Sequence, residues 1–261
     1  MKKRVLLTGY KGFIGSRFVE LHHDKYEIVV SDMDSAEHIE NTLSLYKFDC
    51  VFHIGAITDT TSTDSQEMFE YNSLFSDRLI QTALDNDVPV IFSSSASLYG
   101  SGDSIPLNLY AWSKWATENK WAGHEKFTAL RYFNVYGIGE HNKNPKMTSV
   151  LYQHLYKDKF KLFSGNPIPM RDFVYVDDVI SANIHAFENS LWGVYDVGTA
   201  VARPFEDFAT ILGKDIEYID NPIKSQYQNY TCADDKKFLT NWTPKYNLET
   251  SIKEIVKYYN V

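Results

Sequence analysis

The first half of the chain alternates short apolar runs with longer segments in which apolar residues recur every three or four positions. The apolar runs, rich in β-branched and aromatic residues, lie at 4–9, 26–32, 49–56, 88–96 and 127–137. The segments with helical spacing lie at 13–24, 35–47, 65–87 and 109–121. Short apolar runs predict buried strands, and the longer periodic segments predict amphipathic helices. Their alternation predicts a parallel sheet with helices on both faces.

Beyond Gly139 this regular alternation weakens. A helix is expected over 147–160, a loop that leads into a strand over 165–179, and a further sheet strand at 193–199. Shorter elements are expected at 205–213, 215–220 and 251–259. The pattern predicts an α/β protein, a Rossmann-type doubly wound parallel sheet with a small C-terminal lobe over the carboxyl edge of its strands, where such sheets bind ligands.

The turn after the first strand, "TGYKGFIG", carries three evenly spaced glycines, Gly9, Gly12 and Gly15. Glycines let the backbone approach a pyrophosphate, and the start of the following helix supplies N–H groups and a positive dipole. Three glycines in a strand–helix turn can also serve packing alone. Asp32 ends the second strand, close to the distance at which an acidic residue binds a ribose, although a helix cap is its alternative role. Together these features favour dinucleotide binding.

The acidic residues Asp32, Asp34 and Glu37 cluster, and no Lys or Arg lies between Asp32 and Lys47. A 2′-phosphate would be repelled there. The sequence therefore favours NAD over NADP, with NADP still possible because a distant cation can reach the site.

Tyr110 and Lys114 stand four positions apart on a predicted helix, so both side chains lie on one face. A nearby positive charge lowers the pKa of a phenol from about 10, which suits a tyrosine that acts as a base. The alternative is that both are ordinary surface residues. The pair by itself does not decide between these interpretations.

Composition narrows the class of protein. The net charge is −8 over 261 residues, which argues against nucleic acid or an anionic membrane as partner. No apolar run approaches the length of a membrane span, and the N-terminal run is expected to be a strand instead of a signal peptide. Only two cysteines occur, far apart, so we expect no disulfide, a cytoplasmic location and no metal site.

With the glycine turn, "SSSASLYG" and the Tyr110–Lys114 pair, the chain resembles the extended short-chain dehydrogenase/reductase family. The segments "LRYFNVYG" and "RDFVYVDDV" resemble its nucleotide-sugar epimerase and dehydratase branch. Within the branch, "HIGAITDTTSTD", "KLFSGNPIPMRDFVYVDDV" and "YQNYTCADD" are most similar to the ADP-glycero-manno-heptose 6-epimerases. The resemblance implies an NAD-dependent epimerase that acts through a transient keto-sugar, on an ADP-heptose-like or other nucleotide-diphosphate sugar, and a homodimer.

The resemblance also implies site residues. The catalytic residues would be Ser95, Tyr110, Lys114 and Lys143, with Lys146 as the alternative to Lys143. The cofactor would be bound by Gly9, Gly12, Phe13, Ile14, Gly15, Asp32, Met33, Gly55, Ala56, Ile57, Asn72, Ser93, Tyr110, Lys114, Tyr132 and Val135. The sugar nucleotide would be bound by Ser95, Asn134, Phe163, Arg171 and Tyr227. Residues 1–140 with 174–198 would form the dinucleotide-binding domain, and 141–173 with 199–261 the substrate-binding lobe.

The chain departs from the family pattern after Asp32, because a single short helix precedes the strand at 49–56. One strand–helix unit is therefore expected to be missing. The alternatives to an epimerase are a dehydratase, a net reductase and a non-catalytic dinucleotide-binding protein. Against the dehydratase, the sequence has Ser95-Ala96-Ser97 where that branch has Thr-Asp-Glu. Against the non-catalytic protein, it retains Tyr110 and Lys114.

Overall fold

The computed structural model describes residues 2–31, 36–100, 102, 105–165, 167–221 and 228–261. Its main sheet has six parallel strands in the order β2-β1-β3-β4-β5-β9. These strands are β1 Arg4–Thr8, β2 Glu27–Ser31, β3 Cys50–His53, β4 Val90–Ser95, β5 Phe127–Tyr132 and β9 Gly193–Val197. The predicted parallel sheet is confirmed.

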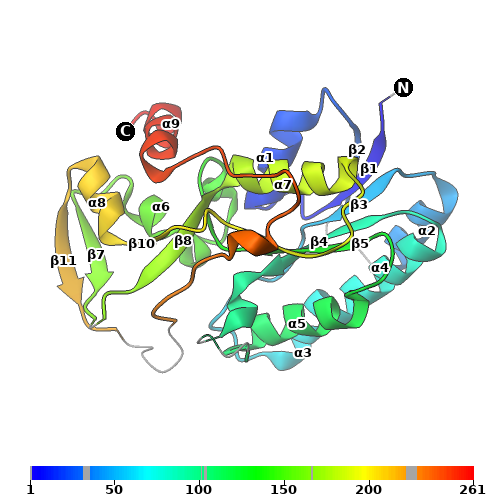
Figure 1. Ribbon diagram of the computed structural model, residues 1–261, viewed down its shortest axis with the longest axis horizontal. Coiled ribbons are helices and arrows are strands. Elements are labelled where there is room, and N and C mark those ends of the chain that lie inside the picture. The colour runs from blue at the N-terminus through cyan, green and yellow to red at the C-terminus, as the bar shows by residue number, and fades with distance from the viewer. Residues whose placement is uncertain (1, 32–35, 101, 103–104, 166, 222–227) are drawn as a thin grey trace.

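Helices cover both faces of this sheet (Figure 1). One face carries α1 Phe13–His22 and α7 Val176–Glu188, which contact each other. The other carries α2 Ala36–Leu45, α3 Ser65–Phe69, α4 Phe75–Asp85 and α5 Leu109–Trp121. Because β1, β3, β4 and β5 are almost wholly buried, these strands form continuous apolar runs in the sequence.

The helix expected over 65–87 is continuous but not uniform. Between α3 and α4 the backbone forms a π-helical turn, η1 Glu70–Leu74. A π turn inserts one residue into the helix and rotates the side chains that follow. Here it lies beside α5 and buries Asn72 between the two helices.

The segment expected to be one strand at 127–137 is two. After β5, Phe133 leaves the main sheet, and β6 Asn134–Tyr136 pairs in parallel with β8 Met170–Tyr175. β10 Ala202–Pro204 completes this three-stranded sheet as an antiparallel edge. The chain thus turns from the main sheet toward a second layer at the carboxyl edge of β5.

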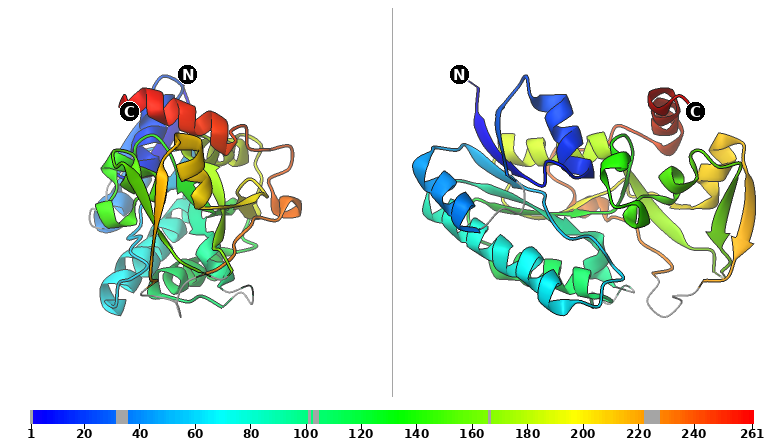
Figure 2. Two further views of the ribbon diagram at one scale, coloured as in Figure 1. Left: turned by 90° about the vertical axis from the view of Figure 1, so that its left-hand side faces the viewer. Right: turned by 180° about the vertical axis from the view of Figure 1, so that it is seen from behind.

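The helix expected over 147–160 is much shorter, because only α6 Val150–His154 is α-helical there. η4 Pro145–Met147 precedes α6, and β7 Lys159–Phe163 follows it and pairs with β11 Asp215–Ile219. Alternate burial along β7 has period two, which sequence periodicity cannot distinguish from a helix in so short a run. α8 Glu206–Leu212 and α9 Leu248–Tyr259 pack against this end of the molecule (Figure 2). The proposed division into two domains stays a prediction.

β2 is the edge strand of the main sheet, and among the described residues only α2 lies between it and β3. The order 3-2-1-4-5-6 of doubly wound sheets places one more strand beyond this position. The expected missing unit is confirmed. Its absence leaves Val30 41% exposed and opens a groove along β2 that is lined by Tyr26, Ile28 and Val30.

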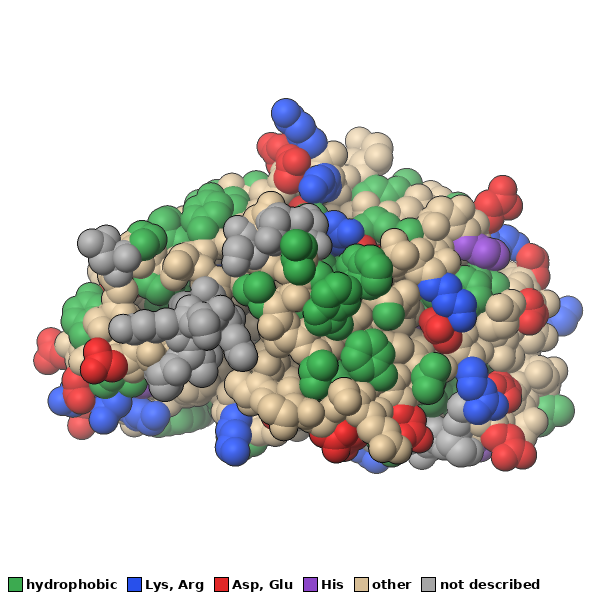
Figure 3. All heavy atoms as spheres, turned by 90° about the horizontal axis from the view of Figure 1, so that it is seen from below, with side chains coloured by type: hydrophobic (Ala, Val, Ile, Leu, Met, Phe, Trp, Pro, Cys, Tyr) green, Lys and Arg blue, Asp and Glu red, His purple; other side chains and the backbone are tan. Residues whose placement is uncertain are grey.

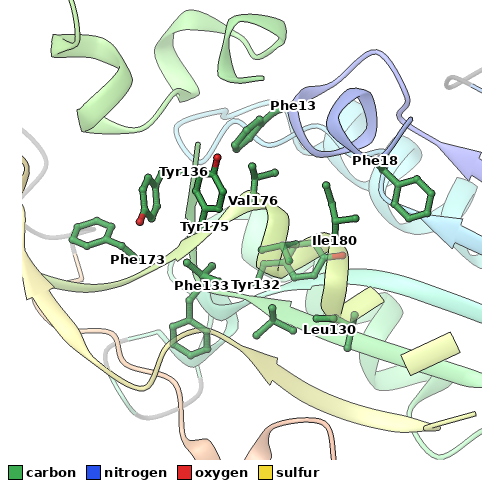
Figure 4. Packing of buried hydrophobic residues seen from close by; sticks show 14 of the residues in the cluster. Phe13, Phe18, Leu130, Tyr132, Phe133, Tyr136, Phe173, Tyr175, Val176 and Ile180 are labelled. Carbon is green, nitrogen blue, oxygen red and sulfur yellow. The ribbon is translucent and has the colours of Figure 1, made fainter. Parts of the chain in front are cut away.

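The larger hydrophobic core lies where the main sheet meets the second layer. Figure 4 shows Phe13 of α1, Tyr136 of β6, and Tyr175 and Val176 at the β8–α7 junction packed close together. None of the helices within the described ranges is long and apolar enough to span a membrane.

The turn from β1 to α1 is built on backbone contacts that leave no room for side chains. Gly9 has a φ of +72°, and a Cβ on it would lie 2.5 Å from the Cα of Gly55. A Cβ on Gly15 would lie 2.2 Å from the carbonyl oxygen of Gly9. Gly12 differs, because its nearest neighbour would be the same oxygen at 3.3 Å and its φ of −77° suits any residue.

We therefore expect Gly15→Ala to lower the free energy of unfolding by about 1–3 kcal/mol or more, because the backbone itself must move to admit the methyl group. Gly12→Ala is the matched control and should cost about 1 kcal/mol at most. Urea denaturation of both variants measures the difference. Equal losses would contradict the assignment of Gly15 to close packing.

Candidate active site

Several of the predicted site residues lie at the carboxyl edge of the main sheet. Thr8 pairs in register with His53, and Ser95 with Tyr132, so β1, β3, β4 and β5 all end at this edge. The glycine turn follows β1, and its Gly12 amide donates to the carbonyl oxygen of Gly9 at 3.0 Å. Gly55, at the end of β3, is anchored by its amide to the hydroxyl of Thr8. Gly9, Gly12, Gly15 and Gly55 thus form one cradle.

Ser95 ends β4, and Tyr110 is the second residue of α5. The Ser97 hydroxyl donates to the Ser95 oxygen at 2.9 Å. Ser95 lies close enough to the Tyr110 phenol to act against the rise in its pKa. α5 starts at Leu109 because the Asn108 side chain caps it, accepting from the amide of Ala111. The cap fixes the first turn of α5, and with it the position of Tyr110.

The pKa of Tyr110 is not lowered in the protein alone. Burial raises it above its usual value, and Ser95 offsets part of that increase. The sequence predicted a decrease caused by Lys114. Desolvation is the larger of the two influences on Tyr110. Burial also lowers the pKa of Lys114, to about 7, so its positive charge is only partly present near neutral pH.

Lys114 is 1% exposed, and its ammonium lies 4.6 Å from the centre of the Phe92 ring. Its Nζ and the hydroxyl of Thr231 are the buried side-chain polar atoms in the described ranges that have no hydrogen-bond partner. An amine withdrawn from water without an acceptor is costly. A ligand that supplies an acceptor would remove that cost.

Asn72 was expected to touch the cofactor. The structure shows both ends of its amide engaged inside the protein, because Oδ1 accepts from the Ile57 amide and Nδ2 donates to the Ile57 carbonyl, each at 2.8 Å. Nδ2 also lies 3.1 Å from the hydroxyl of Ser113, next to Lys114. Asn72 thus fixes the loop of Gly55, Ala56 and Ile57 against α5.

The predicted site residues at and just after the end of β5 differ in how far they are buried. The Tyr132 phenol is buried, donates to Asn183 at 2.9 Å and accepts from Ser93 at 3.1 Å, and burial raises its pKa to about 12. Val135 is half-buried and Asn134 is exposed, both on β6. In this structure the Ser93 hydroxyl therefore serves as a hydrogen-bond donor to Tyr132.

Lys143 lies in the loop between β6 and α6. Its ammonium is 5.6 Å from the centre of the Phe13 ring, and Phe13 directly follows Gly12. Lys143 therefore reaches the glycine turn from the α1 side, whereas Ser95 and Tyr110 approach from β4 and α5. Lys146 is exposed. Hydrogen bonds from Thr61 lower the pKa of Asp59, and the charge of Lys146 adds a smaller decrease.

Arg171 is buried on β8. Its guanidinium donates to the Met170 carbonyl at 2.9 Å and lies 5.7 Å from the Phe205 ring centre. Asp172 accepts instead from the amides and hydroxyl of the 199–200 turn. Phe163 ends β7 and is half-buried, and Ile14 packs against the core. The predicted residues Asp32, Met33 and Tyr227 lie outside the described residues.

Sequence reasoning missed a buried ionic network under Ser95. Glu118 is one turn beyond Lys114 on α5; it accepts from Ser94 and pairs with Arg131 of β5. Arg131 in turn donates to the Tyr99 phenol at 2.9 Å. In the sequence the signal for this network is Glu118 four positions after Lys114, a spacing that is also common on solvated helix faces.

These residues fit a dinucleotide. The glycine cradle ends at the start of α1, where free N–H groups and the helix dipole attract a pyrophosphate. Lys114 provides a buried donor without a partner, as a ribose hydroxyl would require. Tyr110 and Ser95 supply a hydroxyl pair beside it.

Comparisons with known proteins agree with this geometry. Residues 5–198 match the model of the NAD-dependent epimerase/dehydratase family. The chain is 31% identical to an ADP-L-glycero-D-manno-heptose-6-epimerase of Brachyspira hyodysenteriae, with 96% of each chain covered. That match spans 306 positions, more than the chain possesses, so the relative carries residues that are missing here.

Among solved structures, the Helicobacter pylori ADP-L-glycero-D-manno-heptose-6-epimerase superposes with a TM-score of 0.86 at 28% identity, covering 100% of this chain and 97% of that one. The UDP-glucose 4-epimerase of Thermotoga maritima superposes with a TM-score of 0.83 at 25% identity, covering 98% of both chains. The family match, which spans the glycine cradle and the Tyr110–Lys114 helix of this chain, and the 31% identical relative show that the chain belongs to the NAD-dependent epimerase/dehydratase family.

Proposed function

We propose that the chain is an NAD-dependent nucleotide-sugar epimerase that acts through a keto-sugar intermediate. The observation that carries this proposal is the buried Lys114 ammonium without a hydrogen-bond partner, on the same helix as Tyr110, whose phenol Ser95 influences. The relatives at 25–31% identity described above are all named as epimerases, which supports the reaction class. An ADP-heptose-like sugar is the substrate that two of these names favour.

NAD, when bound, would supply reversible acceptance of a hydride from the sugar carbon. Tyr110 would take the proton from the sugar hydroxyl, and Ser95 would orient that hydroxyl. Lys114 would hold the nicotinamide ribose and contribute positive charge near the phenol. Because burial alone raises the pKa of Tyr110, we infer that the charges assembled on binding must favour the tyrosinate.

The remaining cofactor contacts would come from the cradle and its neighbours. Gly9, Gly12, Phe13, Ile14 and Gly15 would meet the pyrophosphate, and the 55–57 loop, held by Asn72, would line the other side. Tyr132 and Val135 would flank the nicotinamide. Asp32 with Met33 would receive the adenosine ribose, and the preference for NAD over NADP remains a prediction.

The sugar nucleotide would be bound from the second layer. Arg171 offers a planar guanidinium that suits a diphosphate, provided that it exchanges the Met170 carbonyl for the ligand. Asn134, Phe163 and Tyr227 would complete the pocket. Lys143 would act as a second acid or base on the far side of the sugar from Tyr110. A cytoplasmic location accords with this substrate class.

The direct test is incubation of the purified protein with NAD and a panel of ADP-, UDP- and dTDP-linked sugars, with products resolved by mass spectrometry and NMR. An epimer of unchanged mass, with no net change in NAD absorbance, is expected. A product lighter by one water would instead identify a dehydratase, and stoichiometric consumption of NADH a reductase.

We expect Tyr110→Phe to lower kcat by about 10²–10⁴-fold, because it removes the proton acceptor and almost no volume. NAD affinity and the thermal midpoint should stay close to those of the unmodified chain. Steady-state turnover, calorimetry and thermal unfolding measure the three quantities. Unchanged turnover would remove this mechanism, and joint loss of fold and NAD binding would make Tyr110 a structural residue.

The pKa of Lys114, about 7 in the free protein, makes NAD binding depend on pH. A ribose oxygen that accepts from the ammonium raises this pKa, so the bound state holds more protons above pH 7. Affinity is therefore expected to be highest below pH 7 and to fall as the pH rises above it, with proton uptake on binding. Calorimetry at pH 8 in two buffers of different ionisation enthalpy measures the uptake. The Lys114→Met variant should bind NAD more weakly and without proton uptake. Proton release when the unmodified chain binds NAD would contradict the assignment of Lys114 to the ribose.

We also expect a homodimer through η1 and α5. Hydrophobic side chains gather in the middle of the face shown in Figure 3. η1 carries the exposed Tyr71 and Leu74, and α5 the exposed Trp112 and Trp115. Two symmetric copies would cover them. Trp112→Glu should shift sedimentation toward monomer, whereas Tyr218→Glu on the distant β11 should not. An unmodified chain that sediments only as monomer at micromolar concentration would exclude this dimer.

A further inference from the structure

The loop that carries Lys143 is held by one buried carboxylate. Glu140 is 1% exposed and accepts from the Gly137 amide at 3.0 Å, from the Ser149 hydroxyl at 2.7 Å and from the Ser149 amide. Gly137 and Ser149 stand at the two ends of the loop. Glu140 thus closes the loop on itself.

The hydrogen-bond pattern favours the ionised form of Glu140. Two of its three partners are backbone amides, which can only donate, and the third is the Ser149 hydroxyl. The Ser149 hydroxyl already accepts from the Tyr152 amide at 3.1 Å, so its own hydrogen is directed at Glu140. An ionised carboxylate this deeply buried calls for a cation nearby.

Lys143 is three residues further along the chain and lines the same pocket as Glu140. Burial raises the pKa of Glu140, and the three hydrogen bonds and Lys143 act against the rise. Burial lowers the pKa of Lys143, and Glu140 is the charge that opposes the decrease. The Lys143 backbone amide also donates to the Glu140 carbonyl at 3.0 Å, so the short helix η3 Glu140–Asn142 sets the spacing of the two residues.

The same loop is attached to α1 through Asn142 and to α9 through Gly139. The Asn142 side-chain amide donates to the Ser16 hydroxyl at 3.0 Å, and the Gly139 backbone amide donates to the Tyr259 phenol at 3.0 Å. Lys143 then lies over the Phe13 ring. α1 and α5 cover opposite faces of the main sheet, so Lys143 and Tyr110 are supplied from opposite sides (Figure 1).

Other titratable groups face this pair. The phenols of Tyr152 and Tyr259 lie within the influence of Glu140, and His141 contacts the Tyr259 phenol. Lys146 and Lys157 line the adjoining pocket of about 570 Å³, together with Glu140 and Lys143. Near neutral pH these neighbours add positive charge or none, so Glu140 is the one group here that favours the charged form of Lys143 among the residues that the structure describes.

We propose that Glu140 is a positioning residue that keeps Lys143 protonated and directed at the sugar from the side opposite Tyr110. This inference rests on the proposed function, in which Lys143 is the second acid or base. In this arrangement a single buried carboxylate, that of Glu140, sets both the position and the charge of Lys143.

The test is NMR of the full chain after reductive ¹³C-methylation of its lysines, with the Lys143 signal identified by its loss in Lys143→Arg. In Glu140→Gln the titration of Lys143 should move to lower pH, because the opposing charge has gone. Ser149→Ala is the matched control, since it removes a hydrogen bond to the same carboxylate but no charge. Its Lys143 titration should stay with that of the unmodified chain.

A second measurement needs no change at Glu140. In the unmodified chain, the Lys143 signal should show an additional inflection in the acid range, as Glu140 takes up its proton. If this inflection is absent, or if Glu140→Gln leaves the Lys143 titration in place, Glu140 is only a loop cap and the proposal is overturned.

Kinetics then separate this inference from the proposed function. In Glu140→Gln, the alkaline limb of the kcat profile should move to lower pH, while KM changes little and the limb set by Tyr110 stays. If the unmodified chain turns over no nucleotide sugar but the Lys143 titration still shifts, the proposed function fails and the coupling of Glu140 and Lys143 stands.

Discussion

The site depends on the burial of one ammonium group. Lys114 is enclosed by α5, β4 and the Phe92 ring, without a hydrogen-bond partner in the described protein. Such an arrangement is tolerated because the pKa falls to about 7, which lets the group lose its charge while no ligand is bound. A ligand with an acceptor at this point restores the charge, and with it the electrostatic pull on the neighbouring phenol.

The surroundings of Lys114 hold it in place from three directions. Asn72, displaced inward by the π turn of η1, links the 55–57 loop to Ser113 beside it. One turn further along α5, Glu118 ties the helix to β4 through Ser94 and to β5 through Arg131. These internal bonds explain why a helix with two exposed tryptophans still presents Tyr110 and Lys114 at a fixed distance from the glycine cradle.

The shortened sheet leaves this machinery intact because the missing unit lies at the opposite edge. β2 is the outermost strand of the main sheet. Ser95 ends β4 and Tyr132 ends β5, and β6, which comes next along the chain, belongs to the second layer. The loss therefore affects the surface next to the predicted adenosine site, and not the region where Tyr110 and Lys143 approach from opposite faces.

The sequence by itself determined the parallel sheet, the glycine turn, the missing unit and the helix of Tyr110 and Lys114, because each rests on a local period or a short motif. Only the tertiary structure decided the break at Phe133, the strand β7 within a predicted helix, and the inward role of Asn72. It also decided the sign of the Tyr110 pKa shift, since desolvation depends on what surrounds the phenol and not on a residue four positions away. In the sequence Glu140 resembles a solvated loop acid. Folding brings Gly137 and Ser149 to either side of it, because hydrogen-bond partners and burial are properties of the packed chain.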